Sequence, residues 1–283
     1  MQESGDRPID LISLSAVAGV VPPHTDDPAS VAALLDRVGA VVLMGAGTDE
    51  SAAAGIARRT LGDRLVAAAR PIAVTDGGGR DRRLTEDAAR RMLPLHTDGF
   101  AYGASAPDVF FLVCTTPSAD DGMSFLVDQL ALLDALAACD APGPELVDFV
   151  RHHVVDQTEP GAHPALGPIA LPLPNGRAAV RRSIAVRPAD DDPDPARTAR
   201  LLTLWQGLLD AVAALVPRFR LEAGDAIAID NTRVAHGRDA YTADDRLLWR
   251  CWAWTDRAGG VPDGELWSDT RMLVGDSPGY MQR

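Results

Sequence analysis

Lysine is absent from this chain of 283 residues, so its 27 basic residues are all arginines. The absence excludes lysine chemistry, because neither a Schiff base nor the phosphate-binding lysine of a P-loop can form. Positive charge is scarce overall, since 40 acidic residues leave a formal net charge of −13 at pH 7. Nucleic acids and anionic membranes need a basic binding face, so we expect neither as a partner.

Cysteine is also scarce, and long apolar runs are missing. The odd, widely spaced set of Cys114, Cys139 and Cys251 fits reduced thiols better than a disulfide framework. No apolar run approaches the roughly 20 residues of a membrane-spanning helix. The first residues lack the basic-then-apolar pattern of a signal peptide. We therefore expect a cytoplasmic protein, and the sequence does not indicate its oligomeric state.

Hydrophobic residues make up 46% of the chain, which is ordinary for a globular protein with a sizeable core. Periodicity predicts helices over residues 29–38, 49–69, 129–139 and 196–216. Apolar and β-branched runs predict strands over residues 40–44, 108–114, 123–127, 177–188, 225–230 and 246–254. We expect the 123–127 strand to pair with 108–114, and the last two strands to flank a loop that carries His236. This order predicts a mixed α/β protein with a mainly β, antiparallel core, and the length allows one large domain or two small ones.

Two separate stretches carry candidate metal ligands. Residues 93–100 read LPLHTDGF, with His96 and Asp98 two positions apart, so an extended backbone directs both side chains to one face. Residues 229–238 read IDNTRVAHGR and contain His236. Two imidazoles and one carboxylate make the facial triad of non-haem Fe(II), which leaves coordination positions open. The same three ligands also suit Zn²⁺ or Mn²⁺ in a hydrolase.

Arginine interrupts the apolar strand RLLWRCWAW at Arg246 and Arg250, which lie four apart and therefore on one face. A buried arginine is costly unless it meets a carboxylate. That carboxylate is either an acidic side chain of the chain itself or the distal carboxylate of a dicarboxylate co-substrate.

Together these motifs resemble the Fe(II)/2-oxoglutarate-dependent dioxygenases of the taurine dioxygenase and clavaminate synthase-like superfamily. HTDG resembles the segment with the first two ligands, DNTRVAHGR the distal-histidine motif, and RLLWR the strand of the 2-oxoglutarate arginine. GMSFLVD at 122–128 is similar to a Gly-x-Thr-x-x-x-Asp stretch, with Ser124 in place of the threonine. The resemblance covers roughly residues 36–255, between short variable terminal segments.

The resemblance implies that His96, Asp98 and His236 bind Fe(II) and that 2-oxoglutarate chelates the iron. It implies that an arginine, assisted by Ser124, holds the far carboxylate of 2-oxoglutarate. Arg250 is favoured because RLLWRCW is closer to the clavaminate-type pattern, and Arg246 is retained because taurine-type members use the first arginine. The fold implied is a double-stranded β-helix, or jelly roll, with flanking helices.

The activity implied is hydroxylation of a small metabolite, such as an amino acid or a natural-product intermediate, with O₂ and with decarboxylation of 2-oxoglutarate to succinate. The intact Asp98 argues against the related halogenases, which lack this carboxylate. Phe100, Tyr102 and Arg238 lie beside the ligands and are candidates for the substrate pocket. Alternatives are desaturation or cyclisation on the same scaffold, a Zn/Mn-dependent hydrolase, and a jelly-roll binding protein with a vestigial site.

Overall fold

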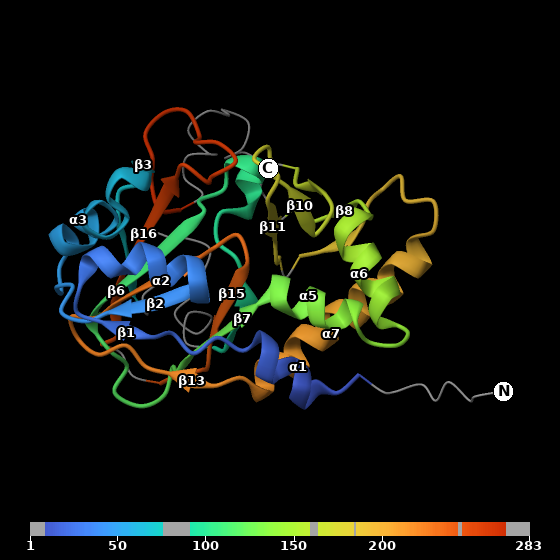
Figure 1. Cartoon of the computed structure of the whole chain (residues 1–283), viewed down its shortest axis with the longest axis horizontal. Helices are drawn as coiled ribbons and strands as arrows, with labels where there is room; N and C mark the ends of the chain where they lie inside the picture. The colour runs from blue at the N-terminus through green and yellow to red at the C-terminus, as the bar shows by residue number, and fades with distance from the viewer. Residues whose placement is uncertain (1–8, 76–90, 159–163, 184, 243–244, 270–283) are drawn as a thin grey trace.

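The computed structural model describes residues 9–75, 91–158, 164–183, 185–242 and 245–269, and two facing β-sheets dominate it. Helices cover the outer face of each sheet (Figure 1). This confirms a mixed α/β fold with a mainly β core. None of the helices in these residues is long and apolar enough to cross a membrane, and all three cysteines are free.

The larger sheet has seven strands, with β1 parallel to β2 and the other pairs antiparallel. Its order is β1 (His24–Thr25), β2 (Ala40–Leu43), β14 (Ala226–Asp230), β6 (Val109–Thr116), β16 (Leu247–Thr255) and β3 (Leu65–Ala68), while β4 (Ile72–Thr75) also pairs with β16. Every residue of β2 and β14 is buried, as expected of strands covered on both faces.

The smaller sheet has four antiparallel strands. Its order is β13 (Arg218–Phe219), β7 (Ser124–Asp128), β15 (Val234–Arg238) and β5 (Leu93–His96). Two minor sheets complete the β structure: β12 (Arg187–Pro188), β8 (Val155–Asp156) and β9 (Leu166–Gly167) in one, and β10 (Ala170–Pro172) with β11 (Ala178–Val180) in the other.

Two helix groups cover the sheets. The group on the larger sheet is α2 (Val31–Val38) and α3 (Glu50–Leu61), with the short helices η1 (Pro28–Ser30) and η2 (Gly62–Arg64) at their ends. The group on the smaller sheet is α1 (Leu11–Ala18), α5 (Gln129–Ala137), α6 (Gly143–His152) and α7 (Pro195–Leu215). A further short helix, η3 (Phe100–Ser105), follows β5.

Successive side chains of a strand point to opposite faces. Each main strand therefore contributes side chains both to the core between the sheets and to a core between its sheet and the helices. In β6, Phe111 packs outward in the α3 cluster, whereas Phe110 packs inward with Trp252 and Trp254 of β16. Leu126 of β7 belongs to the same inner cluster, so the two sheets form a sandwich around it.

Four element predictions are wrong, because local periodicity does not specify which strands pair. The helix predicted over 49–69 ends at Leu61, and Leu65–Ala68 pairs with β16 as strand β3. The 123–127 segment pairs with β13 and β15 in the smaller sheet and not with β6. The predicted strand 177–188 forms two short strands, β11 and β12, in different sheets.

The predicted loop around His236 is strand β15, and it lies in the smaller sheet. Its sequence neighbours β14 and β16 both lie in the larger sheet. The chain therefore crosses between the sheets twice here, and no hairpin joins β15 to β16.

We expect Trp205→Ala to lower the free energy of unfolding by about 3–5 kcal/mol, because it leaves a cavity where a large side chain was buried. Trp205 lies in α7, is 1% exposed and packs in the cluster outside the smaller sheet. Leu204→Ala on the same helix is the control, since Leu204 is 39% exposed. Urea unfolding measures both, and equal losses would contradict the packing described.

Candidate functional site

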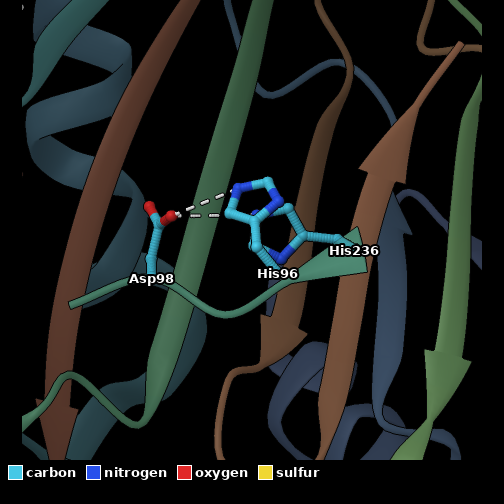
Figure 2. A group of neighbouring side chains, drawn as sticks. All are labelled: His96, Asp98 and His236. Carbon is cyan, nitrogen blue, oxygen red and sulfur yellow. Dashed lines mark ion pairs between the residues drawn. The ribbon is translucent and has the colours of Figure 1, made fainter. Parts of the chain in front are cut away.

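The three candidate ligands converge between the sheets (Figure 2). His96 at the end of β5 and His236 in β15 are register partners, so both side chains point to the same face. Their ring centroids are 4.2 Å apart. Asp98 lies two residues beyond β5, with its carboxylate directed at the two rings.

A tight turn after β5 places Asp98. Gly99 has φ +66°, and a Cβ there would lie 2.6 Å from Pro107 Cδ, so the glycine of HTDG is required by both conformation and space. The Asn231 side chain accepts a hydrogen bond from the Asp98 backbone N–H (3.0 Å) and donates to the Asp98 and Pro107 carbonyls (2.8 Å each). The two sequence motifs, HTDG and DNTR, are therefore connected by hydrogen bonds.

The donor atoms fit a metal ion. Asp98 Oδ1 lies 3.6 Å from His96 Nε2 and 3.9 Å from His236 Nε2, and the three ligand atoms lie within 4.8 Å of one another. His96 Nδ1 is 3.0 Å from the Pro94 carbonyl, and donation to it leaves the Nε2 lone pair for a metal. His236 stacks on Phe110 at 4.5 Å, and its buried Nδ1 has no hydrogen-bond partner among the residues that the structure describes. Two imidazoles and a carboxylate suit a divalent transition metal.

The charge state of the three groups also suits a metal. Burial lowers the pKa of His96, although the Asp98 carboxylate raises it. Burial and the neighbouring His96 lower the pKa of His236 to about 3. Burial raises the pKa of Asp98, but Arg250, the two histidines and the Trp252 hydrogen bond outweigh it, so the pKa is lowered on balance. At neutral pH both imidazoles are unprotonated and the carboxylate is ionised.

The second oxygen of Asp98 is bound from β16. Its Oδ2 accepts a hydrogen bond from Trp252 Nε1 at 2.8 Å and lies 3.2 Å from Arg250 Nη1. Arg250 Nε donates to the Ser268 carbonyl at 2.8 Å. Arg250 thus meets a carboxylate of the chain itself, one of the two possibilities that the sequence left open. The contact of Trp252 was missed, although it follows Arg250 by two residues and so shares its face.

The remaining candidates from the sequence, Ser124, Arg238 and Arg246, lie around Arg238, which is two residues beyond His236 in β15. Ser124 and Arg238 are register partners on β7 and β15, on the same face as His236. The Arg238 guanidinium lies over the Tyr241 ring at 4.3 Å, and Arg246 lies 5.3 Å from the same ring. The structure therefore groups Arg246 with Arg238, and Arg250 with Asp98.

The substrate-pocket candidates make different contacts. Arg238 is buried and donates to the Arg91 carbonyl at 2.9 Å. Tyr102 in η3 packs edge-on against Trp252 at 6.2 Å and donates to the Asp269 carbonyl at 3.1 Å. Phe100 begins η3, but its side chain lies outside the described residues. Contact of these residues with a substrate stays a prediction.

Several solved structures share this fold. Asparagine oxygenase in complex with Fe(II), 2S,3S-3-hydroxyasparagine and succinate aligns with TM-score 0.56 and 19% identity, covering 86% of this chain and 78% of that one. A taurine dioxygenase from Burkholderia xenovorans gives 0.56 and 18%, covering 88% and 85%. The non-heme iron oxygenase OrfP with Fe, succinate and (3S)-hydroxy-L-Arg gives 0.53 and 17%, covering 79% and 77%.

At these identities the structural likeness shows the fold alone. No curated protein matches the sequence. The model of one family, described as "Taurine catabolism dioxygenase TauD, TfdA family", matches residues 14–252. That match spans most of the chain, including both histidine motifs and Arg250, and the chain therefore belongs to the TauD, TfdA family of dioxygenases.

Proposed function

We propose that this protein is an Fe(II)- and 2-oxoglutarate-dependent oxygenase that hydroxylates a small metabolite. The observation that carries the proposal is the convergence of two neutral imidazoles and one ionised carboxylate at a buried point, in a member of a dioxygenase family. The asparagine oxygenase and OrfP structures hold hydroxylated amino acids with succinate, which supports an amino acid or a related natural-product intermediate as the substrate.

The two facing sheets support a double-stranded β-helix, organised as one domain over 1–283 with its family-like core at about 36–255. A cytoplasmic location stays a prediction.

His96, Asp98 and His236 are the residues that would hold the iron. Iron bound there would supply, with 2-oxoglutarate and O₂, the oxidising power for hydroxylation, with succinate and CO₂ as the products of 2-oxoglutarate. The surrounding residues of the chain keep the imidazoles unprotonated and the carboxylate ionised. The buried apolar side chains of Phe110, Leu126 and Trp252 exclude water from the site. Each of these contributions is preorganised in the fold.

In our proposal Arg250 in β16 and Arg246, which immediately precedes that strand, bind opposite ends of 2-oxoglutarate. Arg250 lies at hydrogen-bond distance from a metal-facing carboxylate, so it is placed for the near, iron-chelating end. The far carboxylate lies three carbons away. Arg246 lies four residues before Arg250, just outside β16 and at most about 13 Å away along the chain, and a long side chain can span part of that distance. Arg246 lies over the same ring as Arg238, the register partner of Ser124, which supports Arg246 and Ser124 as the far clamp.

Desaturation or cyclisation on this scaffold differs from hydroxylation only in how the substrate lies. A Zn/Mn-dependent hydrolase would use the same three ligands. The cationic group beyond His236 favours the oxygenase, because hydrolysis requires no clamp for a dicarboxylate.

Anaerobic addition of Fe(II) and 2-oxoglutarate to the metal-free protein is expected to produce the weak visible charge-transfer band of an iron-bound 2-oxoglutarate chelate. His236→Ala removes a ligand, so the band is expected to disappear in that variant. His152→Ala is the control, because His152 is an exposed residue at the end of α6 that pairs with Asp148. A wild-type protein without the band would contradict the oxygenase assignment, and addition of a chelator should abolish the band.

Arg246→Met is expected to weaken 2-oxoglutarate binding by roughly 30-fold or more, because loss of a charge partner in a partly buried site costs about 2 kcal/mol or more. Its Fe(II) affinity is expected to stay within about threefold of wild type. Arg250→Met is expected to weaken Fe(II) binding as well, since it removes a partner of Asp98.

Anaerobic titration of the charge-transfer band measures both ligands. If instead Arg250→Met alone weakened 2-oxoglutarate binding, with normal Fe(II) affinity, the far clamp would belong to Arg250.

Metal affinity is expected to change little between pH 8 and pH 6. Exposed imidazoles titrate near pH 6.5 and compete with the metal below that pH by about tenfold per unit for each histidine. Here burial lowers the pKa of both His96 and His236, to about 3 for His236, so protons compete with the metal less than they do at an exposed site. Mn(II) binding followed by EPR at each pH tests this, and a tenfold loss between pH 7 and pH 6 would contradict it.

A further inference from the structure

The two oxygens of the Asp98 carboxylate have different surroundings. Oδ1 faces His96 Nε2 and His236 Nε2, at 3.6 and 3.9 Å. Oδ2 meets two donors from β16, Trp252 Nε1 at 2.8 Å and Arg250 Nη1 at 3.2 Å. Asp98 is 6% exposed, so these neighbours and not solvent set the rotation of its carboxylate.

We propose that Trp252 is a positioning residue that, with Arg250, restricts Asp98 to binding the metal through Oδ1 alone. The inference rests on the proposed function, in which Asp98 is a metal ligand. Carboxylates bind metals through one oxygen or through both. Because Oδ2 accepts the Trp252 indole N–H at 2.8 Å, the indole holds this oxygen toward β16, away from the position that Oδ1 and the two imidazoles face.

The indole is fixed from several sides. Trp252 is 2% exposed, and its backbone N–H donates to Ser268 Oγ at 3.0 Å. Ser268 Oγ in turn donates to the Arg70 carbonyl at 2.8 Å, which ties β16 to the segment between β3 and β4. The ring packs against Tyr102 and lies 3.6 Å from the position that a Cβ of Gly99 would take. A rigid donor of this kind holds an acceptor at low entropic cost.

The two donors differ in kind, and this explains why both are present. Arg250 carries a charge, so an incoming anion such as the near carboxylate of 2-oxoglutarate competes with Asp98 for it. The indole N–H is neutral and has no such competitor of opposite charge. Trp252 therefore still holds Oδ2 when the N–H groups of Arg250 also bind the near carboxylate of 2-oxoglutarate.

The restriction has a consequence for coordination. A facial triad occupies three positions of an octahedral metal and leaves three for the co-substrate and O₂. Binding of Asp98 through both oxygens would occupy a fourth position. Loss of the indole N–H is therefore expected to impair binding of the two-point chelator more than binding of the metal itself.

Trp252→Phe and Trp254→Phe form a matched pair for the test. Trp254 lies two residues along β16 on the same face, is 0% exposed, and donates its indole N–H to the Ser105 carbonyl at 2.9 Å, away from Asp98. Both variants lose one indole hydrogen bond and the same side-chain volume. Only the first frees Asp98 Oδ2.

Anaerobic titration gives the Kd of Fe(II) and then the Kd of 2-oxoglutarate for the iron-loaded protein, from the charge-transfer band. Co(II) absorption gives coordination number without any turnover. For Trp252→Phe we expect 2-oxoglutarate affinity to fall by roughly 10-fold or more, in the range for outer-sphere partners of metal ligands. Its Fe(II) affinity should stay within about threefold, and its Co(II) spectrum should change intensity. Trp254→Phe should stay within about threefold of wild type in every measurement.

A further variant separates the hydrogen bond from packing. Replacing Trp252 with 3-benzothienylalanine keeps the shape of the ring and removes only the N–H, so it should reproduce the effect of Trp252→Phe. A benzothienyl variant with wild-type affinity, or equal behaviour of the two phenylalanine variants, would overturn the proposal. A wild-type band with unaffected Trp252 variants refutes this inference alone, whereas absence of the band in wild type refutes the proposed function with it.

Discussion

The antiparallel pairing of β15 with β5 is the constraint on which the candidate site depends. It makes His236 and His96, which are far apart in the sequence, register partners with side chains on the same face. Because side chains alternate along a strand, a slip of one residue would turn His96 toward the helices and bring Leu95 inward. β5 is an edge strand, so its register needs support from outside the sheet. Leu95, 1% exposed, packs in the cluster of α5 and α7, and Thr97 exchanges hydrogen bonds with the backbone of Arg182 in both directions.

The side chains between the sheets are apolar around the histidines and cationic further along the strands. Phe110, Leu126 and Trp252 form a dry floor around the histidines, where a low dielectric strengthens every polar contact. Further along β15, Arg238 and Arg246 share the ring of Tyr241. A protein with a net charge of −13 thus gathers two arginine side chains at this ring, Arg238 buried and Arg246 partly buried. Bulk charge would have suggested a cationic ligand, whereas the interior suits an anionic co-substrate.

The sequence predicted local elements and motifs, but it did not predict contacts between segments that are far apart in the chain. Strong periodicity identified α7 and β6 nearly to the residue, and the motif spacing named the three residues that the structure brings together. The strand predicted over 123–127 is present, but its partners are β13 and β15, because an apolar run does not specify which sheet it joins. The bond from Trp252 to Asp98 was missed for the same reason: it connects segments that only the fold brings together.

Asp98 shows how the chain tolerates a buried charge before a metal arrives. A carboxylate out of water is costly unless it is paired and hydrogen-bonded. Arg250 supplies the opposite charge, Trp252 supplies a neutral donor, and the backbone N–H of Asp98 is bound by Asn231. Burial alone would raise the pKa of this group, and these partners with the two histidines reverse the shift. The carboxylate is therefore ionised, and one of its oxygens is already directed at both imidazoles. The same contacts that stabilise the buried charge hold the site in the geometry that metal binding needs.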